Sequence, residues 1–162
     1  MSIAELLFDL PPIDGWETRL QVTYIAPPEP ADPSLPAQIQ QEPSPRSNIV
    51  VSRILTTESN AGAACSTFLS QTAGAISDLD LVTTPTDVTF DDGAEGVIVQ
   101  VGFSAAAGIR LRQFHAFRID GTILTQLVAT ADEAGDPEKR DELRQKLLGF
   151  VPNGRLLTRA NP

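Results

Sequence analysis

Apolar and polar residues alternate along residues 16–25, where Trp16, Leu20, Val22 and Tyr24 fall on one side. Alternation with a period of two is typical of a β-strand that buries one face. Further apolar runs, bounded by glycine, proline or acidic residues, predict more strands. These runs cover residues 2–9, 47–53, 79–84, 88–90, 97–104, 109–119 and 122–131.

Residues 56–76 follow a different spacing, of three and four, which places apolar side chains on one face of a helix. That face consists of Ala64, Phe68, Leu69, Thr72 and Ile76. Ser59 or Asn60 is the expected N-cap, because its side-chain oxygen can accept a hydrogen bond from a first-turn N–H group.

Residues 136–151 predict a second helix. Asp136 can cap it, Pro137 fits the first turn, and Gly149 can end it. The remaining strands are joined by short turns, which favours antiparallel pairing. The sequence therefore predicts an α+β fold, an antiparallel sheet of about six strands with two main helices packed on it.

Residues 111–131 predict a hairpin whose turn is centred on Asp120 and Gly121, since an Asp-Gly pair readily adopts positive φ. The expected cross-strand pairs are Phe117 with Leu124, His115 with Gln126, and Gln113 with Val128. One face of the hairpin then carries a mixture of aliphatic, aromatic and amide side chains, namely Leu111, Gln113, His115, Phe117, Leu124, Gln126 and Val128.

The opposite face of this hairpin carries Phe114, Ile123, Leu127 and Ala129, which we expect to pack on a helix of the same domain. A sheet exposed to water on one side has one polar face, and this hairpin has none. Something must therefore cover the mixed face. Two interpretations remain open: a partner molecule lies there, or the two helices of the chain cover both faces.

Composition narrows the class of protein. The 162 residues carry a net charge of −9 and a sequence pI near 4.4, which argues against nucleic acid as a partner. We expect one domain over residues 1–151, with a proline-rich loop at 27–46 inside it and a tail at 152–162. The N-terminus lacks the features of a signal peptide, and no apolar run is long enough to insert into a membrane. The expected location is cytoplasmic.

The residue types of this chain give little support to a catalytic function. The chain has a single histidine, His115, and a single cysteine, Cys65, so zinc ligands are lacking and an internal disulfide cannot form. Asp91, Asp92 and Glu95 could in principle bind a metal, but their glycine neighbours favour a solvated turn. We expect no enzyme activity, no cofactor and no metal. A ligand buried near His115 would favour the weaker alternative of a small-molecule binder or enzyme.

Several segments together resemble the DcrB-related family, and most closely its Eag-type branch, the chaperones of type VI secretion effectors. They are a short strand leading to Asp14-Gly15-Trp16, the strand from Asn48 to Arg53, and a strand of pattern [QR]-x-[FQ]-x-x-apolar that runs into a tight turn. The resemblance spans most of residues 5–150. It implies the PsbP-like fold that Mog and DcrB share.

The resemblance also implies a function. Members of this branch are non-enzymatic cytoplasmic adaptors, usually homodimers, that shield the apolar N-terminal helices of a secreted effector. The mixed face of the hairpin would then line the groove for those helices, with its seven residues as the partner-binding set. Charged residues at Gln113 or Phe117 should abolish this binding and leave folding intact. The alternative is an accessory protein-binding domain of the same fold that has no hydrophobic client.

Overall fold

The computed structural model describes residues 19–27, 46–105 and 108–152. The strands are β1 (Arg19–Ile25), β2 (Asn48–Leu55), β3 (Asp80–Thr89), β4 (Glu95–Ser104), β5 (Arg110–Asp120) and β6 (Ile123–Asp132). The helices are α1 (Ala61–Ala75) and α2 (Pro137–Leu148). The predicted strand at 2–9, the Trp16 motif, most of the proline-rich loop and most of the tail lie outside the described residues.

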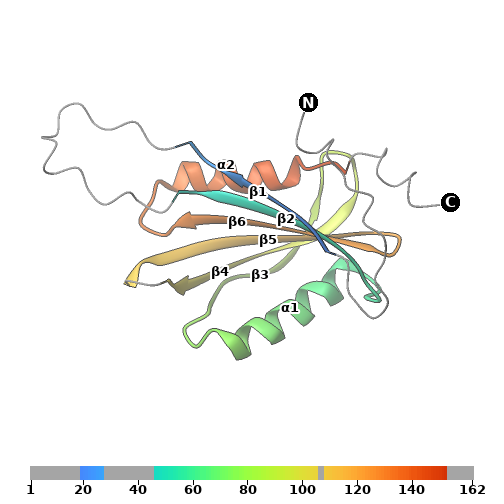
Figure 1. The fold of residues 1–162 in the computed structure, drawn as a ribbon, viewed down its shortest axis with the longest axis horizontal. Helices are drawn as coiled ribbons and strands as arrows, with labels where there is room; N and C mark the ends of the chain where they lie inside the picture. Colours follow the sequence, from blue (N-terminus) through green and yellow to red (C-terminus); the bar gives the residue numbers. More distant parts are fainter. Residues whose placement is uncertain (1–18, 28–45, 106–107, 153–162) are drawn as a thin grey trace, which may run out of the picture.

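The six strands form one antiparallel sheet in the order β1-β2-β6-β5-β4-β3. The helices lie on opposite sides of it, α1 below and α2 above in the view of Figure 1. Helix α1 packs against β4 and β5, whereas α2 packs against β5 and β6. The predicted α+β fold, with about six antiparallel strands and two main helices, is confirmed.

Each helix packs on one face of the sheet, and a separate apolar core lies beneath it. On the α1 side the buried cluster consists of Ala64, Cys65, Val97, Val99, Phe117 and Leu124. On the α2 side it consists of Val51, Phe90, Ile98, Phe114, Ala116, Leu127, Ala129, Ala131, Leu143 and Leu147. Two cores arise because neighbouring residues of a strand point to opposite faces of the sheet, and the central strands carry apolar residues at both odd- and even-numbered positions.

Helix α1 begins at Ala61, later than the spacing predicted. Asn60 is its N-cap, with the side-chain oxygen accepting a hydrogen bond from the Ala63 N–H at 2.9 Å. The residues just after β2 remain tied to the sheet, because the Thr56 N–H donates to the Thr122 carbonyl at 2.9 Å. The predicted N-cap and apolar face are nevertheless present, with Ala64 buried and Phe68 half-buried.

Helix α2 follows its sequence signals closely. Asp136 accepts a hydrogen bond from the Glu138 N–H at 2.9 Å, Pro137 begins the helix, and Gly149 caps its end. The buried residues of α2 are Leu143 and Leu147, one turn apart. Within the described part of the chain, no helix is long and apolar enough to cross a membrane.

Strand β3 corrects one prediction. The sequence predicted two short strands on either side of Pro85, but Asp80–Thr89 is one strand with register shifts between Leu81 and Thr83 and between Thr83 and Thr86. Because β3 lies at the edge of the sheet, the missing N–H of proline leaves no inner ladder broken.

The hairpin of β5 and β6 corrects a second prediction. Its two-residue loop is Gly121-Thr122, with Asp120 paired to Ile123, instead of the expected Asp120-Gly121. Gly121 has φ of +64°, as the first central residue of such a loop requires. The predicted pairs are therefore displaced by two residues: Phe117 pairs with Gln126 rather than with Leu124.

Candidate functional site

All seven residues predicted to bind a partner lie on the α1 side of the sheet. The displacement by two residues preserves which face each side chain occupies, because strand side chains alternate with a period of two. Three of the seven are buried beneath or beside α1, namely His115, Phe117 and Leu124. The other four are half-buried, namely Leu111, Gln113, Gln126 and Val128.

Helix α1 covers only part of this face. It lies over β4 and β5, while α2 lies on the other side of the sheet. Beside α1, on β2, β5 and β6, six half-buried side chains form a surface that we call the lateral patch. Its members are Val50, Ser52, Leu111, Gln113, Gln126 and Val128.

The register builds this patch from neighbouring positions. Val50 pairs with Val128, and Ser52 pairs with Gln126, across β2 and β6. The two valines provide apolar contact area, and the glutamine beside them provides an amide. Such a mixture can pack against an apolar helix and also satisfy isolated polar groups on it.

A chain of hydrogen bonds links the lateral patch to His115. The Gln113 amide nitrogen donates to Thr130 Oγ1 at 3.0 Å, and Gln113 Oε1 lies 3.0 Å from His115 Nε2. The Gln126 amide nitrogen lies 3.4 Å from His115 Nδ1. A neutral ring protonated at Nε2 satisfies both contacts, because it donates to Gln113 and accepts from Gln126.

Burial keeps the imidazole neutral. His115 is 4% exposed, and burial lowers its pKa from 6.5 to about 4. Its ring lies 4.3 Å, between centroids, from the ring of Phe68 on α1. His115 therefore joins α1 to the amides of the lateral patch, and at neutral pH it acts as an uncharged positioning group for Gln113 and Gln126.

On the α2 side, Arg118 fastens the hairpin to the turn between β3 and β4. Its guanidinium makes two hydrogen bonds of 2.8 Å to Asp120 and one of 3.1 Å to Asp92, and it lies 5.0 Å from the Phe90 ring centroid. Burial alone would lower the pKa of Arg118, but the hydrogen bonds and charges of the two aspartates outweigh it and raise the pKa.

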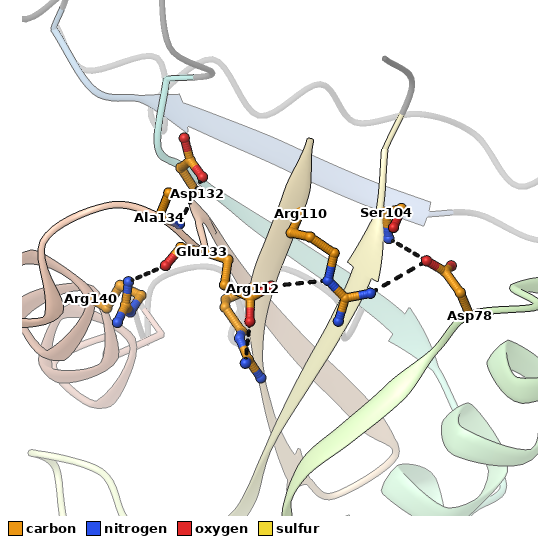
Figure 2. Close-up of polar contacts among 8 residues, drawn as sticks. All are labelled: Asp78, Ser104, Arg110, Arg112, Asp132, Glu133, Ala134 and Arg140. Carbon is orange, nitrogen blue, oxygen red and sulfur yellow. Dashed lines mark hydrogen bonds and ion pairs between the residues drawn. The ribbon is translucent and has the colours of Figure 1, made fainter. Parts of the chain in front are cut away.

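Figure 2 shows a second polar network at the opposite end of the hairpin. Glu133, just after β6, accepts hydrogen bonds from Arg110 and Arg112 of β5, while Arg140 of α2 donates to the Glu133 carbonyl at 2.8 Å. The pKa of Glu133 is lowered chiefly by the hydrogen bond from Arg110. This network holds the loop before α2 against the sheet.

Candidate catalytic and metal-binding groups are dispersed. In the described ranges, 19–27, 46–105 and 108–152, no three or more histidine, cysteine or acidic residues come together as a metal site would require. Asp92 is engaged with Arg118 and with the Ala94 N–H. Cys65 of α1 is fully buried, and burial raises the pKa of its thiol, which leaves it a packing residue.

Two hollows lie on the α2 side. The larger has a volume of about 420 Å³ and lies between α2 and strands β3 and β4, lined by Thr83, Thr86, Ile98, Val99, Gln100, Phe114, Pro137, Arg140, Asp141 and Arg144. The smaller, of about 150 Å³, lies between α2 and the β1–β2 end, lined by Tyr24, Ile25, Ala26, Ser47, Asn48, Ile49, Leu143 and Lys146.

Comparison with known proteins gives a fold and no function. No family model and no curated protein matches the chain. Among solved structures, the chain is similar to PA94 from Pseudomonas aeruginosa, a protein of unknown function. The TM-score is 0.61 at 16% sequence identity, with 86% of this chain and 88% of that chain covered. A likeness at this identity extends to the fold alone.

Sequence patterns alone did not identify the larger hollow, nor the contacts of Arg118 with Asp120 and Asp92, which we call the Arg118 clamp. Both join residues far apart in the chain. Arg118 bonds to Asp92, 26 positions earlier, and Gln100 lines the hollow with Arg140 and Arg144, forty or more positions later. The sequence signal that was present is the row of arginines at 110, 112 and 118 on one strand. All three are even-numbered positions of β5, as Phe114 is, so they lie on the face of the sheet that α2 covers.

Proposed function

We propose that this protein is a non-enzymatic adaptor of the chaperone type that binds an apolar helical segment of a partner protein at the lateral patch. The observation that carries the proposal is that α1 packs mainly over β4 and β5 and leaves beside it a half-buried patch of valines, a leucine and glutamines on β2, β5 and β6. The partner class suggested by the sequence resemblance is a type VI secretion effector with apolar N-terminal helices, bound in the cytoplasm.

The chemistry of the patch suits such a client. An apolar helix leaves few polar groups exposed, and those few need a hydrogen-bonding partner when they are buried. Gln126 uses its amide nitrogen toward His115 and keeps its amide oxygen for other donors. Val50 and Val128, paired across the strands, provide the apolar floor.

The buried members of the seven-residue set have a different part. Phe117 is 1% exposed and packs with Phe68 of α1. A charged residue there would disrupt the α1-side core, so a loss of binding in that variant would reflect unfolding. Phe117, His115 and Leu124 are therefore assigned to hold the patch in place, and Gln113, Gln126, Leu111 and Val128 to contact the partner.

Binding can be measured by fluorescence anisotropy with a labelled synthetic peptide of leucine, alanine and serine that forms an apolar helix. Gln126→Lys should weaken binding at least tenfold, because a lysine amine must lose its hydration against an apolar helix. Gln100→Lys, the same change on the opposite face of the sheet, should leave binding unaltered. Equal effects of the two variants, or no saturable binding by the parent protein, would contradict the proposal.

The proposed assembly is a homodimer. Strand β1 is an edge of the sheet, is paired with β2 at every position, and exposes Tyr24 at 53% and Ile25 at 62%. Exposed apolar side chains along a regular edge strand favour association with another chain. Light scattering coupled to size exclusion should give twice the 17.4 kDa chain mass. A monomeric mass over the working concentration range would contradict the dimer.

A second candidate is an accessory protein-binding domain without a hydrophobic client. It is favoured by the helix on each face of the sheet and by the burial of His115, Phe117 and Leu124. Titration with a hydrophobic dye separates the two candidates. The adaptor should bind dye while it is cooperatively folded, and the accessory domain should not.

A further inference from the structure

We propose that the larger hollow on the α2 side is a binding site for a small organic anion, a carboxylate or phosphate carried on an apolar ring. The hollow lies on the opposite side of the sheet from the lateral patch, so this inference is independent of the proposed adaptor function. Its volume of about 420 Å³ lies in the range of small-molecule sites.

The floor of the hollow is apolar and its rim is polar. Phe114 and Ile98, 6% and 5% exposed, lie beneath it on β5 and β4. Thr83 and Thr86 of the irregular edge strand β3 line one side, and Gln100 lies between them and the helix. An apolar floor with a few convergent polar groups is the usual build of a ligand pocket.

The opposite wall is α2, which presents two arginines. Arg140 and Arg144 lie one helical turn apart and both are half-buried. Like charges at this spacing repel each other unless an anion lies between them. Arg144 makes no hydrogen bond or ion pair with any described residue, and Arg140 uses Nη1 on the carbonyls of Glu133 and Gly135. Donors on both guanidiniums therefore remain for a ligand.

A third arginine, Arg112 of β5, lies on the same face of the sheet but does not line the hollow. Arg112 is paired with Gly102 across β4 and β5, one step along the sheet from Gln100 and Phe114, which line the hollow. Its Nη1 is buried and has no hydrogen-bond partner, although Nη2 is bound to Glu133. Because this nitrogen is buried and Arg112 does not line the hollow, we assign the ligand contacts to Arg140 and Arg144.

The guanidinium groups of Arg110 and Arg112, both of which are bound to Glu133, lie against Gly102. A side chain at Gly102 would come within 3.4 Å of guanidinium nitrogens of both Arg110 and Arg112. The acidic group on the rim is Asp141, which is exposed, whereas the arginines beside it are half-buried. In a protein with net charge −9, Arg140 and Arg144 place two guanidinium groups on one wall of the hollow. Guanidinium groups prefer planar carboxylates and phosphates, which accept two hydrogen bonds at once.

The test is an amide NMR titration of the full chain with three ring-bearing probes: benzoate, phenyl phosphate and the neutral benzyl alcohol. We expect saturable shifts at Thr83, Gln100 and Arg140 with an anion and weaker binding of the alcohol. A stronger effect of phenyl phosphate than of benzoate would assign the phosphate class, and the reverse the carboxylate class. Equal binding of all three probes would overturn the proposal.

Two variants of α2 separate a site from general electrostatics. Arg144→Gln should weaken anion binding about tenfold, since a charge-assisted hydrogen bond is lost. Lys146→Gln removes the same charge from the same helix, but Lys146 lines the other hollow and its loss should leave anion binding unchanged. Equal weakening in both variants, or none in Arg144→Gln, would overturn the proposal. Circular dichroism confirms that each variant is folded.

Discussion

His115 Nε2 lies 3.0 Å from Oε1 of Gln113, two residues earlier on the same strand and the same face of the sheet. This contact joins the core beneath α1 to the lateral patch beside it. Burial keeps the ring neutral, and a neutral imidazole that donates to Gln113 can accept from Gln126. The packing of α1 and the orientation of the two amides are therefore coupled through one buried histidine.

Stability should rise with pH between about pH 4 and 6.5. Burial lowers the pKa of His115 from 6.5 to about 4, so the unfolded chain binds this proton more readily than the folded chain. Stability is complete above the unfolded pKa and is lost as pH falls toward the folded pKa, by about 3 kcal/mol at most. Urea unfolding between about pH 5 and 7 measures this slope.

The matched control for this slope is His115→Gln, which keeps a polar side chain and has no titrating group. This variant should lose most of the pH dependence of the unfolding free energy between about pH 5 and 7. The lowered pKa values of Asp78, Asp92 and Glu133 contribute stability that is lost only at lower pH, below the unfolded carboxyl pKa values. A slope that persists unchanged in His115→Gln would show that another group titrates.

Arg118→Ala should lower the free energy of unfolding by about 3 kcal/mol, because it leaves two partly buried carboxylates without their cation. The Arg118 side chain is 4% exposed and bridges Asp120 to Asp92 of a different turn. Arg118→Lys should recover only part of the loss, since one amine cannot make the paired hydrogen bonds to Asp120. Urea denaturation of these variants beside Arg46→Ala, an exposed arginine, makes the comparison. Losses of similar size at positions 118 and 46 would contradict the clamp.

Two glycine-to-alanine changes should have opposite signs. Gly121 has φ of +64°, where a Cβ is strained, so Gly121→Ala should cost about 1 to 2 kcal/mol. Gly74 lies inside α1, and no neighbouring side chain lies within 4 Å of the position that a Cβ would take there. Gly74→Ala should therefore stabilise the protein by up to about 1 kcal/mol. Thermal melting of both variants tests the turn and the helix together. The same sign in both would contradict these backbone assignments.

The hairpin illustrates what the sequence could establish. The loop was predicted one residue too early, which displaced every pair by two, yet each side chain was assigned to its observed face. A displacement by two preserves the faces, and a displacement by one would have exchanged them. Local signals were equally sufficient for α2, where Asp136, Pro137 and Gly149 mark the ends.

Long-range packing could not be obtained in this way. Nothing local in residues 56–76 indicates that α1 lies over β4 and β5 and leaves the lateral patch beside it. The hydrophobic face of a helix shows that it packs, but not on which side of a sheet or over which strands. For the same reason the mixed hairpin face was predicted as one surface, whereas α1 divides it into a buried part with Phe117 and a half-buried part with Gln126.

The most direct test of the proposed adaptor function is an amide NMR titration of the full chain with the apolar helical peptide. We predict saturable shifts at Gln113, Gln126 and Val128 on the lateral patch, and none at Thr83 or Gln100 across the sheet. Shifts centred on Thr83 and Gln100, or no shifts at a peptide concentration that saturates the anisotropy signal, would contradict the assignment of the lateral patch as the partner-binding surface.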